Sequence, residues 1–189
     1  ISAVVAFNGN IGVMWSNQND AAMYFAIHTD GDPDNVWTLN PAVQGPAYAD
    51  DHMNLKSLQA DASGQVFAVT KTSLNDVNPK TSNKPLVLLM ILDQQGSWSR
   101  RTVWQVVDNV TRPIVLLDSQ NRQIYAFSTY QYGTGTSGAI YYKQVSLDNP
   151  SMQFVTGLGT PFMASTTDTH INNASSTKQT VNSSTGLLV

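Results

Sequence analysis

The chain has 189 residues, a formal net charge of −3 at pH 7 and no cysteine. Hydrophobic residues make up 41% of it and charged residues only 12%, against roughly 25% charged residues in an average soluble domain. The lack of cysteine excludes a disulfide scaffold and thiol chemistry, and the scattered basic residues exclude the charge pattern of a nucleic-acid-binding protein. No apolar run approaches the roughly 18–20 residues that span a bilayer. A surface built from Asn, Gln, Ser and Thr favours an all-β protein that is secreted or displayed at the cell surface.

The first predicted element is a β-hairpin over residues 2–16, because an Asn-Gly turn separates two apolar strands. The same plan of strand, short polar turn and strand recurs at residues 55–70, 113–128 and 177–189. The second strands of these hairpins begin near Ile11, Val66, Ile124 and Leu187, at steps of 55, 58 and 63 residues.

A second kind of unit lies between the hairpins, at residues 23–39, 86–104 and 139–157. Each has a buried strand, an acidic turn and a strand marked by an aromatic residue. These aromatic residues, Trp37, Trp98 and Phe154, follow one another at steps of 61 and 56 residues. The repeating unit is therefore four strands in about 55–60 residues.

Four-stranded antiparallel units repeated at this period are typical of the blades of a β-propeller. An immunoglobulin-like series is the rival all-β interpretation, but its repeat is nearer to about 100 residues. We expect a single partial propeller over residues 1–189, with three complete blades and the first two strands of a fourth. Their approximate bounds are 1–41, 53–106, 111–160 and 171–189.

Three and a half blades do not close a ring, since propellers have about four to eight blades. We therefore expect either that the chain is a piece of a longer protein or that it closes its ring with another chain. No signal peptide is visible, since the sequence opens directly on "ISAVVAF". We expect either that the signal was removed or that the chain is an excerpt of a longer protein.

A pentapeptide marks the entry to successive blades: "DDHMN" at 50–54, "DNVTR" at 108–112 and "DTHIN" at 168–172. Its first residue recurs at steps of 58 and 60 residues, which match the blade period. Because entry loops of a propeller meet around the central channel, these segments supply candidate ligand-binding residues: His52, Asn54, Arg112, His170 and Asn172. The alternative is structural, with Asp capping the turn and His or Asn bonding to neighbouring blades. Two histidines from different blades also suggest an axial metal site. The remaining histidine, His28, lies on a different type of strand, and we expect no metal or other cofactor.

The loops between second and third strands are the other candidate binding segments, because functional groups concentrate in loops on rigid scaffolds. In "TYQYGTGTSG" (129–138), Tyr130 and Tyr132 are suited to stacking on a sugar ring. The alternative is that these are solvated surface loops.

The acidic turns of the second units resemble Asp-boxes, the Ser-x-Asp-x-Gly-x-x-Trp turns of the sialidase-like propeller superfamily. The matching residues are Asp30 and Trp37, Asp93 and Trp98, and Ser146, Asp148 and Phe154. The resemblance implies a structural role between the third and fourth strands, in which the Asp ties the turn and the aromatic ring packs between sheets.

Sialidases also use an arginine clamp and a Tyr/Glu pair, and this chain has no glutamate. We therefore predict a non-catalytic binding or structural module of an exported microbial protein, which presents loops to a carbohydrate or protein ligand. The alternative is a sialidase-like glycoside hydrolase whose active site is completed by missing blades or a second chain.

Overall fold

A computed structural model describes residues 2–50, 53–54, 56–79, 81–130, 138–168, 170–176, 181–186 and 189. In this part of the chain, twelve strands form three four-stranded antiparallel sheets, each with its strands in chain order. The first sheet comprises β1 (Ser2–Phe7), β2 (Asn10–Asn17), β3 (Ala22–Thr29) and β4 (Thr38–Gln44). The second comprises β5 (Leu58–Ala60), β6 (Val66–Lys71), β7 (Pro85–Leu92) and β8 (Trp98–Gln105). The third comprises β9 (Val110–Asp118), β10 (Gln123–Tyr130), β11 (Gly138–Ser146) and β12 (Thr160–Ser165).

The predicted all-β class is confirmed. A single 3₁₀ turn, Val106–Asp108, is the only helical element in the described ranges. Among these residues, no helix is long and apolar enough to cross a membrane.

Local turn chemistry sets the hairpin between the first two strands of each sheet. Asn8 and Gly9 adopt φ values of 45° and 70°, the left-handed pair that a two-residue hairpin turn requires. In the second sheet the Asp61 carboxylate accepts hydrogen bonds from the backbone N–H groups of Ser63 and Gln65. In the third sheet Asp118 accepts a bond from the backbone N–H of Asn121. The hairpins predicted at 2–16, 55–70 and 113–128 are therefore present, each closed by different residues.

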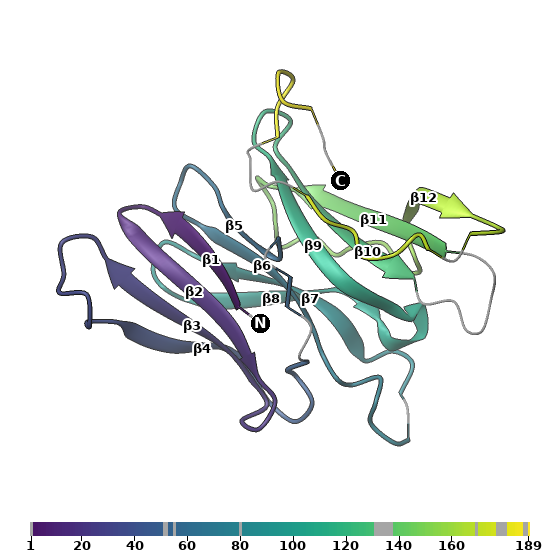
Figure 1. Cartoon of the computed structure of the whole chain (residues 1–189), viewed down its shortest axis with the longest axis horizontal. Coiled ribbons are helices and arrows are strands. Elements are labelled where there is room, and N and C mark those ends of the chain that lie inside the picture. The colour runs from purple at the N-terminus through teal and green to yellow at the C-terminus, as the bar shows by residue number, and fades with distance from the viewer. Residues whose placement is uncertain are drawn as a thin grey trace.

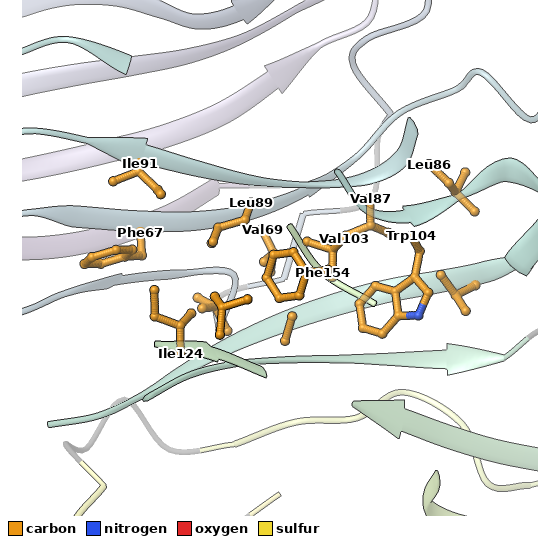
Figure 2. Close-up of a cluster of buried hydrophobic side chains, with 14 of the residues drawn as sticks. Phe67, Val69, Leu86, Val87, Leu89, Ile91, Val103, Trp104, Ile124 and Phe154 are labelled. Carbon is orange, nitrogen blue, oxygen red and sulfur yellow. The ribbon is translucent and has the colours of Figure 1, made fainter. Parts of the chain in front are cut away.

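The second sheet lies between the other two, and both of its faces are buried. We call the face that each sheet turns toward the preceding sheet its back face, and the opposite face its front face. The back face of the second sheet packs against the first sheet through Leu58, Val66, Ala68, Leu88, Met90 and Leu92, which meet Met14, Met23 and Phe25. Its front face packs against the third sheet in the cluster of Figure 2, where Phe67, Val69, Leu89 and Trp104 meet Ile124 and Phe154.

The first strands of the three sheets are neighbours. β5 lies beside both β1 and β9, whereas β4 and β12 lie at opposite ends of the molecule (Figure 1). The backbone N–H of Val115 in β9 donates to the carbonyl of Lys56, at 3.1 Å, and the N–H of Leu117 donates to the side-chain oxygen of Gln59, at 3.0 Å. The inner strands thus join the second and third sheets directly.

The two ends of this stack differ. Ile171, Ala174 and Val189 pack on the front face of the third sheet, beside Ile114 and Leu116. On the back face of the first sheet, large apolar side chains remain exposed. The three sheets do not close into a ring in the described part of the chain.

The fourth, half blade expected at 171–189 is represented by one isolated parallel bridge between Asp118 and Val181. Residues 177–180 and 187–188, which carry most of the predicted strand pair, lie outside the described residues. The sheets themselves extend past the approximate blade limits, since the first ends at Gln44 and the third at Ser165.

Gly12 in β2 is required by close packing. A methyl group at this position would overlap the far end of the Phe25 ring, which is fully buried between Phe7 and Trp98. We expect Gly12→Ala to lower the free energy of unfolding by roughly 1–3 kcal/mol through overpacking. Chemical denaturation measures this. Val77→Ala, at a residue that is 45% exposed in the loop after β6, is the control and should cost much less. Equal costs would contradict the packing argument.

Lys143 in β11 is buried between the second and third sheets without an ion pair at its ammonium among the described residues. Its Nζ donates to the carbonyls of Val103 (2.7 Å) and Val155 (2.8 Å) and lies 5.2 Å from the centroid of the Trp104 ring. Burial lowers the pKa of Lys143 to about 8, and the Asp108 carboxylate acts in the opposite direction.

This lowered pKa predicts a stability that rises with pH. In the unfolded chain the lysine pKa is about 10.4, so between about pH 8 and pH 10 the unfolded state binds more protons than the folded state. The free energy of unfolding should rise by roughly 2 kcal/mol from pH 7.5 to 9.5 because of this residue. Denaturation of the wild type and of Lys143→Met at both pH values checks this. The variant should lose the rise, and parallel pH profiles would refute the assignment.

Candidate functional site

The aspartates that begin the three entry pentapeptides make different local bonds. Asp50 forms a buried ion pair with Lys71 at 2.5 Å. Asp108 accepts a hydrogen bond from the backbone N–H of Gln105, at 2.8 Å. Asp168 accepts from both the backbone N–H (2.8 Å) and the ring Nδ1 (2.7 Å) of His170. Asp108 and Asp168 thus bond within or next to their own entry segment, whereas Asp50 ties its segment to the end of β6.

The last residues of the pentapeptides converge at one end of the inner strands. The Arg112 guanidinium donates to the Asn172 side-chain oxygen at 2.9 Å, across 60 residues of sequence. The Asn54 amide donates to the carbonyl of Ala174, at 3.4 Å. Arg112 also has a φ of 54°, a left-handed backbone that is uncommon for residues other than glycine. The structure thus brings together three of the predicted ligand-binding residues.

Two hydroxyl groups complete this group of residues. The buried Ser57 hydroxyl donates to the carbonyl of Pro113 at 2.8 Å and accepts from the backbone N–H of Asn54, at 3.2 Å. The Thr129 hydroxyl accepts from the backbone N–H of Asn173, at 3.2 Å. We call Asn54, Ser57, Arg112, Thr129 and Asn172 the entry cluster. Ser57 and Thr129 are buried, whereas Asn54, Arg112 and Asn172 are partly or fully exposed. The accessible members offer amide and guanidinium groups, which suit a ligand rich in oxygen atoms.

The loop after β6 lies at the same end of the second sheet. Ser73 donates its backbone N–H to the carbonyl of Ala47 (2.9 Å) and its hydroxyl to that of Ala49 (3.1 Å). Lys71 also donates to the Asn75 side-chain oxygen, at 3.2 Å. The segment before β5 and the loop after β6 therefore lie on one side of the second sheet.

Of the two predicted histidines, only His170 lies within the described residues. His170 is almost fully exposed and paired with Asp168, and His52 lies outside the described residues. The hydrogen bonds from the backbone and then from the ring of His170 lower the pKa of Asp168 below its usual value. Across the described ranges, no group of three or more His, Cys, Asp or Glu side chains is arranged to hold a metal ion.

Of the two predicted stacking tyrosines, Tyr130 is half-buried at the end of β10 and meets Tyr141 edge-on, with centroids 6.1 Å apart. It packs against the core between the second and third sheets, so its ring is only partly available to a ligand. Tyr132 lies outside the described residues.

The acidic turn between β7 and β8 is tied by its aspartate and is followed by a partly buried tryptophan. The Asp93 carboxylate accepts from the backbone N–H groups of Gln95 (2.9 Å) and Ser97 (2.8 Å), which ties the turn. Trp98 packs between the first and second sheets and meets the Phe25 ring edge-on at 5.3 Å.

The turn between β11 and β12 follows this pattern in part. Phe154 is buried between the second and third sheets, which corresponds to the place of Trp98. The turn is held differently, because the backbone N–H of Asp148 donates to the Ser146 hydroxyl at 3.1 Å. The Asp148 carboxylate instead pairs with Arg122 at 2.7 Å on the surface.

The corresponding turn of the first sheet differs because none of the three described sheets covers its aromatic residue. Trp37 stacks on His28 with centroids 5.1 Å apart and donates its indole N–H to the carbonyl of Asp34, yet it remains exposed. Asp30 is exposed, and its backbone N–H donates to the carbonyl of Gly9.

A separate pocket of about 320 Å³ lies at the opposite end of the inner strands from the entry cluster. Its lining comes from β1, β5 and the end of β9, and includes Val4, Ala6, Gln59, Ala60 and Leu117. No sequence pattern pointed to this pocket.

Comparison with protein-family models, with curated proteins and with solved structures gave no match.

Sequence reasoning missed Lys71, Ser57 and Lys143. The only available signal for the two lysines was a lone charge inside or at the end of an apolar strand, in "QVFAVTK" and "AIYYKQV". Ser57 is one serine among many in this chain and carried no distinguishing signal.

Ser57 should be the most stabilising member of the entry cluster. Ser57→Ala leaves the Pro113 carbonyl and the Asn54 N–H without their buried partner, so the free energy of unfolding should fall by roughly 1–3 kcal/mol. Asn172→Ala removes an exposed acceptor and should cost less than about 1 kcal/mol. Thermal or chemical unfolding of both variants gives the comparison, and the reverse order would disprove the assignment.

Proposed function

We propose that the three sheets are successive blades of a β-propeller, and that the chain is a non-catalytic binding or structural module of an exported microbial protein. The observation that carries the proposal is the position of the first strands. β5 lies beside both β1 and β9, and the sheets stack face to face in chain order. A propeller has this arrangement, with first strands around the axis and blades packed through their faces.

The Asp-box-like turns support this proposal independently of strand order. Asp93 ties its turn, and Trp98 and Phe154 each fill the space between two sheets. A relationship with the sialidase-like superfamily is the explanation we favour for these turns. Fold resemblance alone does not supply an activity, since propellers have many unrelated functions.

The ligand surface we propose is the entry cluster together with the neighbouring loops. Arg112 and Asn172 are partly or fully exposed there, and their side chains are already oriented by their mutual hydrogen bond. Such preorganised polar groups on a rigid scaffold suit the hydroxyl groups of a carbohydrate or the backbone of a protein loop. The low content of charged residues and the abundance of Asn and Thr support an extracellular setting.

Binding to carbohydrate and protein arrays tests this proposal. We expect Arg112→Ala and Asn172→Ala each to weaken binding about tenfold or more, because each removes one side of the oriented pair. Arg122→Ala, an exposed arginine at the opposite end of β10, is the matched control and should bind normally. Circular dichroism verifies that the variants remain folded.

Two results would argue against this function. Binding that is unaffected by both substitutions would place the ligand elsewhere. Hydrolysis of an activated sialoside by the wild type, lost in Arg112→Ala, would instead support the glycoside hydrolase alternative.

A further inference from the structure

The back face of the first sheet is exposed, whereas the equivalent face of each of the other two sheets is buried. The strand registers align Val4, Val13 and Ala26 of the first sheet with Leu58, Ala68 and Met90 of the second, and with Val115, Ala126 and Lys143 of the third. In the second and third sheets, the side chains at these positions are at most 3% exposed. In the first sheet, Val4 is 50% exposed.

The same contrast holds for the next row of this face. Ile11 and Trp37 correspond to Val66 and Trp98 of the second sheet, which the first sheet covers. Here they are 38% and 42% exposed, and Leu39 beside them is 54% exposed. The face also carries Ser2, Ala6, Trp15, Tyr24, His28 and Pro41, so none of its residues is Lys, Arg, Asp or Glu.

The opposite end of the stack presents the complementary surface. Residues Ile171, Ala174 and Val189 cover the inner part of the front face of the third sheet. On its outer strand, Phe162 and Met163 remain 39% and 50% exposed, and Phe162 meets Phe127 edge-on. Both junctions inside the chain pair the front face of one sheet with the back face of the next. The two ends of the stack are therefore a back face, on the first sheet, and a front face, on the third sheet, which is the combination that packs together inside the chain.

We propose that the occupant of this surface is the third sheet of a second copy of this chain, so that two copies close one ring head to tail. This proposal depends on the propeller arrangement proposed above. A twofold arrangement makes both junctions equal and leaves no free end, whereas an unclosed head-to-tail contact produces fibres. Two chains of three sheets give six, within the range of about four to eight blades.

The area is sufficient for a stable pair. Four strands about 4.8 Å apart and about seven residues long, at about 3.3 Å per residue, present a face of roughly 440 Å². Two junctions of two faces each then bury up to about 1,800 Å², which is within the standard size range of a specific interface. The segment 171–176 already covers part of one face, so this is an upper limit.

The internal junction also predicts which residues meet. Phe25 contacts Trp98 edge-on between the first and second sheets. By register, Tyr142 corresponds to Phe25 and Trp37 corresponds to Trp98. Trp37 of each copy should therefore contact Tyr142 of the other copy.

Light scattering on a sizing column tests the pairing in the whole chain. The wild type should have twice the mass of one chain at micromolar concentration, and Leu39→Asp should halve that mass. Val107→Asp is the matched control, because Val107 is an apolar residue that is 63% exposed in the turn between the second and third sheets. It should leave the mass unchanged. A monomeric wild type, or a mass that grows beyond two chains with concentration, would overturn the proposal.

Cysteine cross-linking tests the geometry, since the chain has no cysteine of its own. Trp37→Cys and Tyr142→Cys, mixed and oxidised, should give a disulfide-linked pair, and neither variant alone should do so. A linked pair from Trp37→Cys alone would mean that the two back faces meet, which contradicts the head-to-tail ring. Ligand binding separates this proposal from the function: a monomer that binds through the entry cluster overturns only the ring, and a dimer without any ligand overturns only the binding role.

Discussion

A four-stranded sheet has two faces and cannot bury either by itself, and this constraint governs the whole molecule. The second sheet satisfies it fully, because Met14 and Phe25 cover one face and Ile124 and Phe154 cover the other. The first sheet satisfies it on one face only, and the third has its second face partly covered by Ile171, Ala174 and Val189. The aromatic residues in or after the acidic turns follow from the same need, since Trp98 and Phe154 each pack between two sheets.

Local signals made most of the sheet topology predictable. Asn8 and Gly9 specify a hairpin by backbone conformation alone, and apolar strands at regular spacing then give the order of strands within each sheet. The convergence of Arg112 with Asn172 also followed from the repeat, because equivalent positions of stacked units lie close together. The partners of Lys71 and Lys143 were not predictable. Their bonds to Asp50 and to the carbonyls of Val103 and Val155 exist only once separate segments meet, and no spacing in the sequence records those meetings.

The entry cluster shows that one group of polar residues can serve two purposes. Ser57 faces inward and joins the second sheet to the third through the carbonyl of Pro113. Arg112 and Asn172, which are the last residues of their pentapeptides, are more accessible to solvent, and their hydrogen bond orients both side chains. The repeated pentapeptide is therefore neither purely structural nor purely a binding motif. Its buried contacts orient the side chains that remain accessible.

Each sheet is a meander of four consecutive strands, and this topology affects how the chain folds. Almost every strand pair joins segments that are neighbours in the sequence, so the loops closed within a sheet are short and their entropic cost is small. Association between sheets comes as a separate set of contacts, as in other repeat proteins whose units meet only their neighbours. The first and third sheets are then coupled in unfolding mainly through the second sheet. A destabilising substitution in the second sheet should weaken its packing against both neighbours. A destabilising substitution in the first sheet should leave the packing of the second sheet against the third in place.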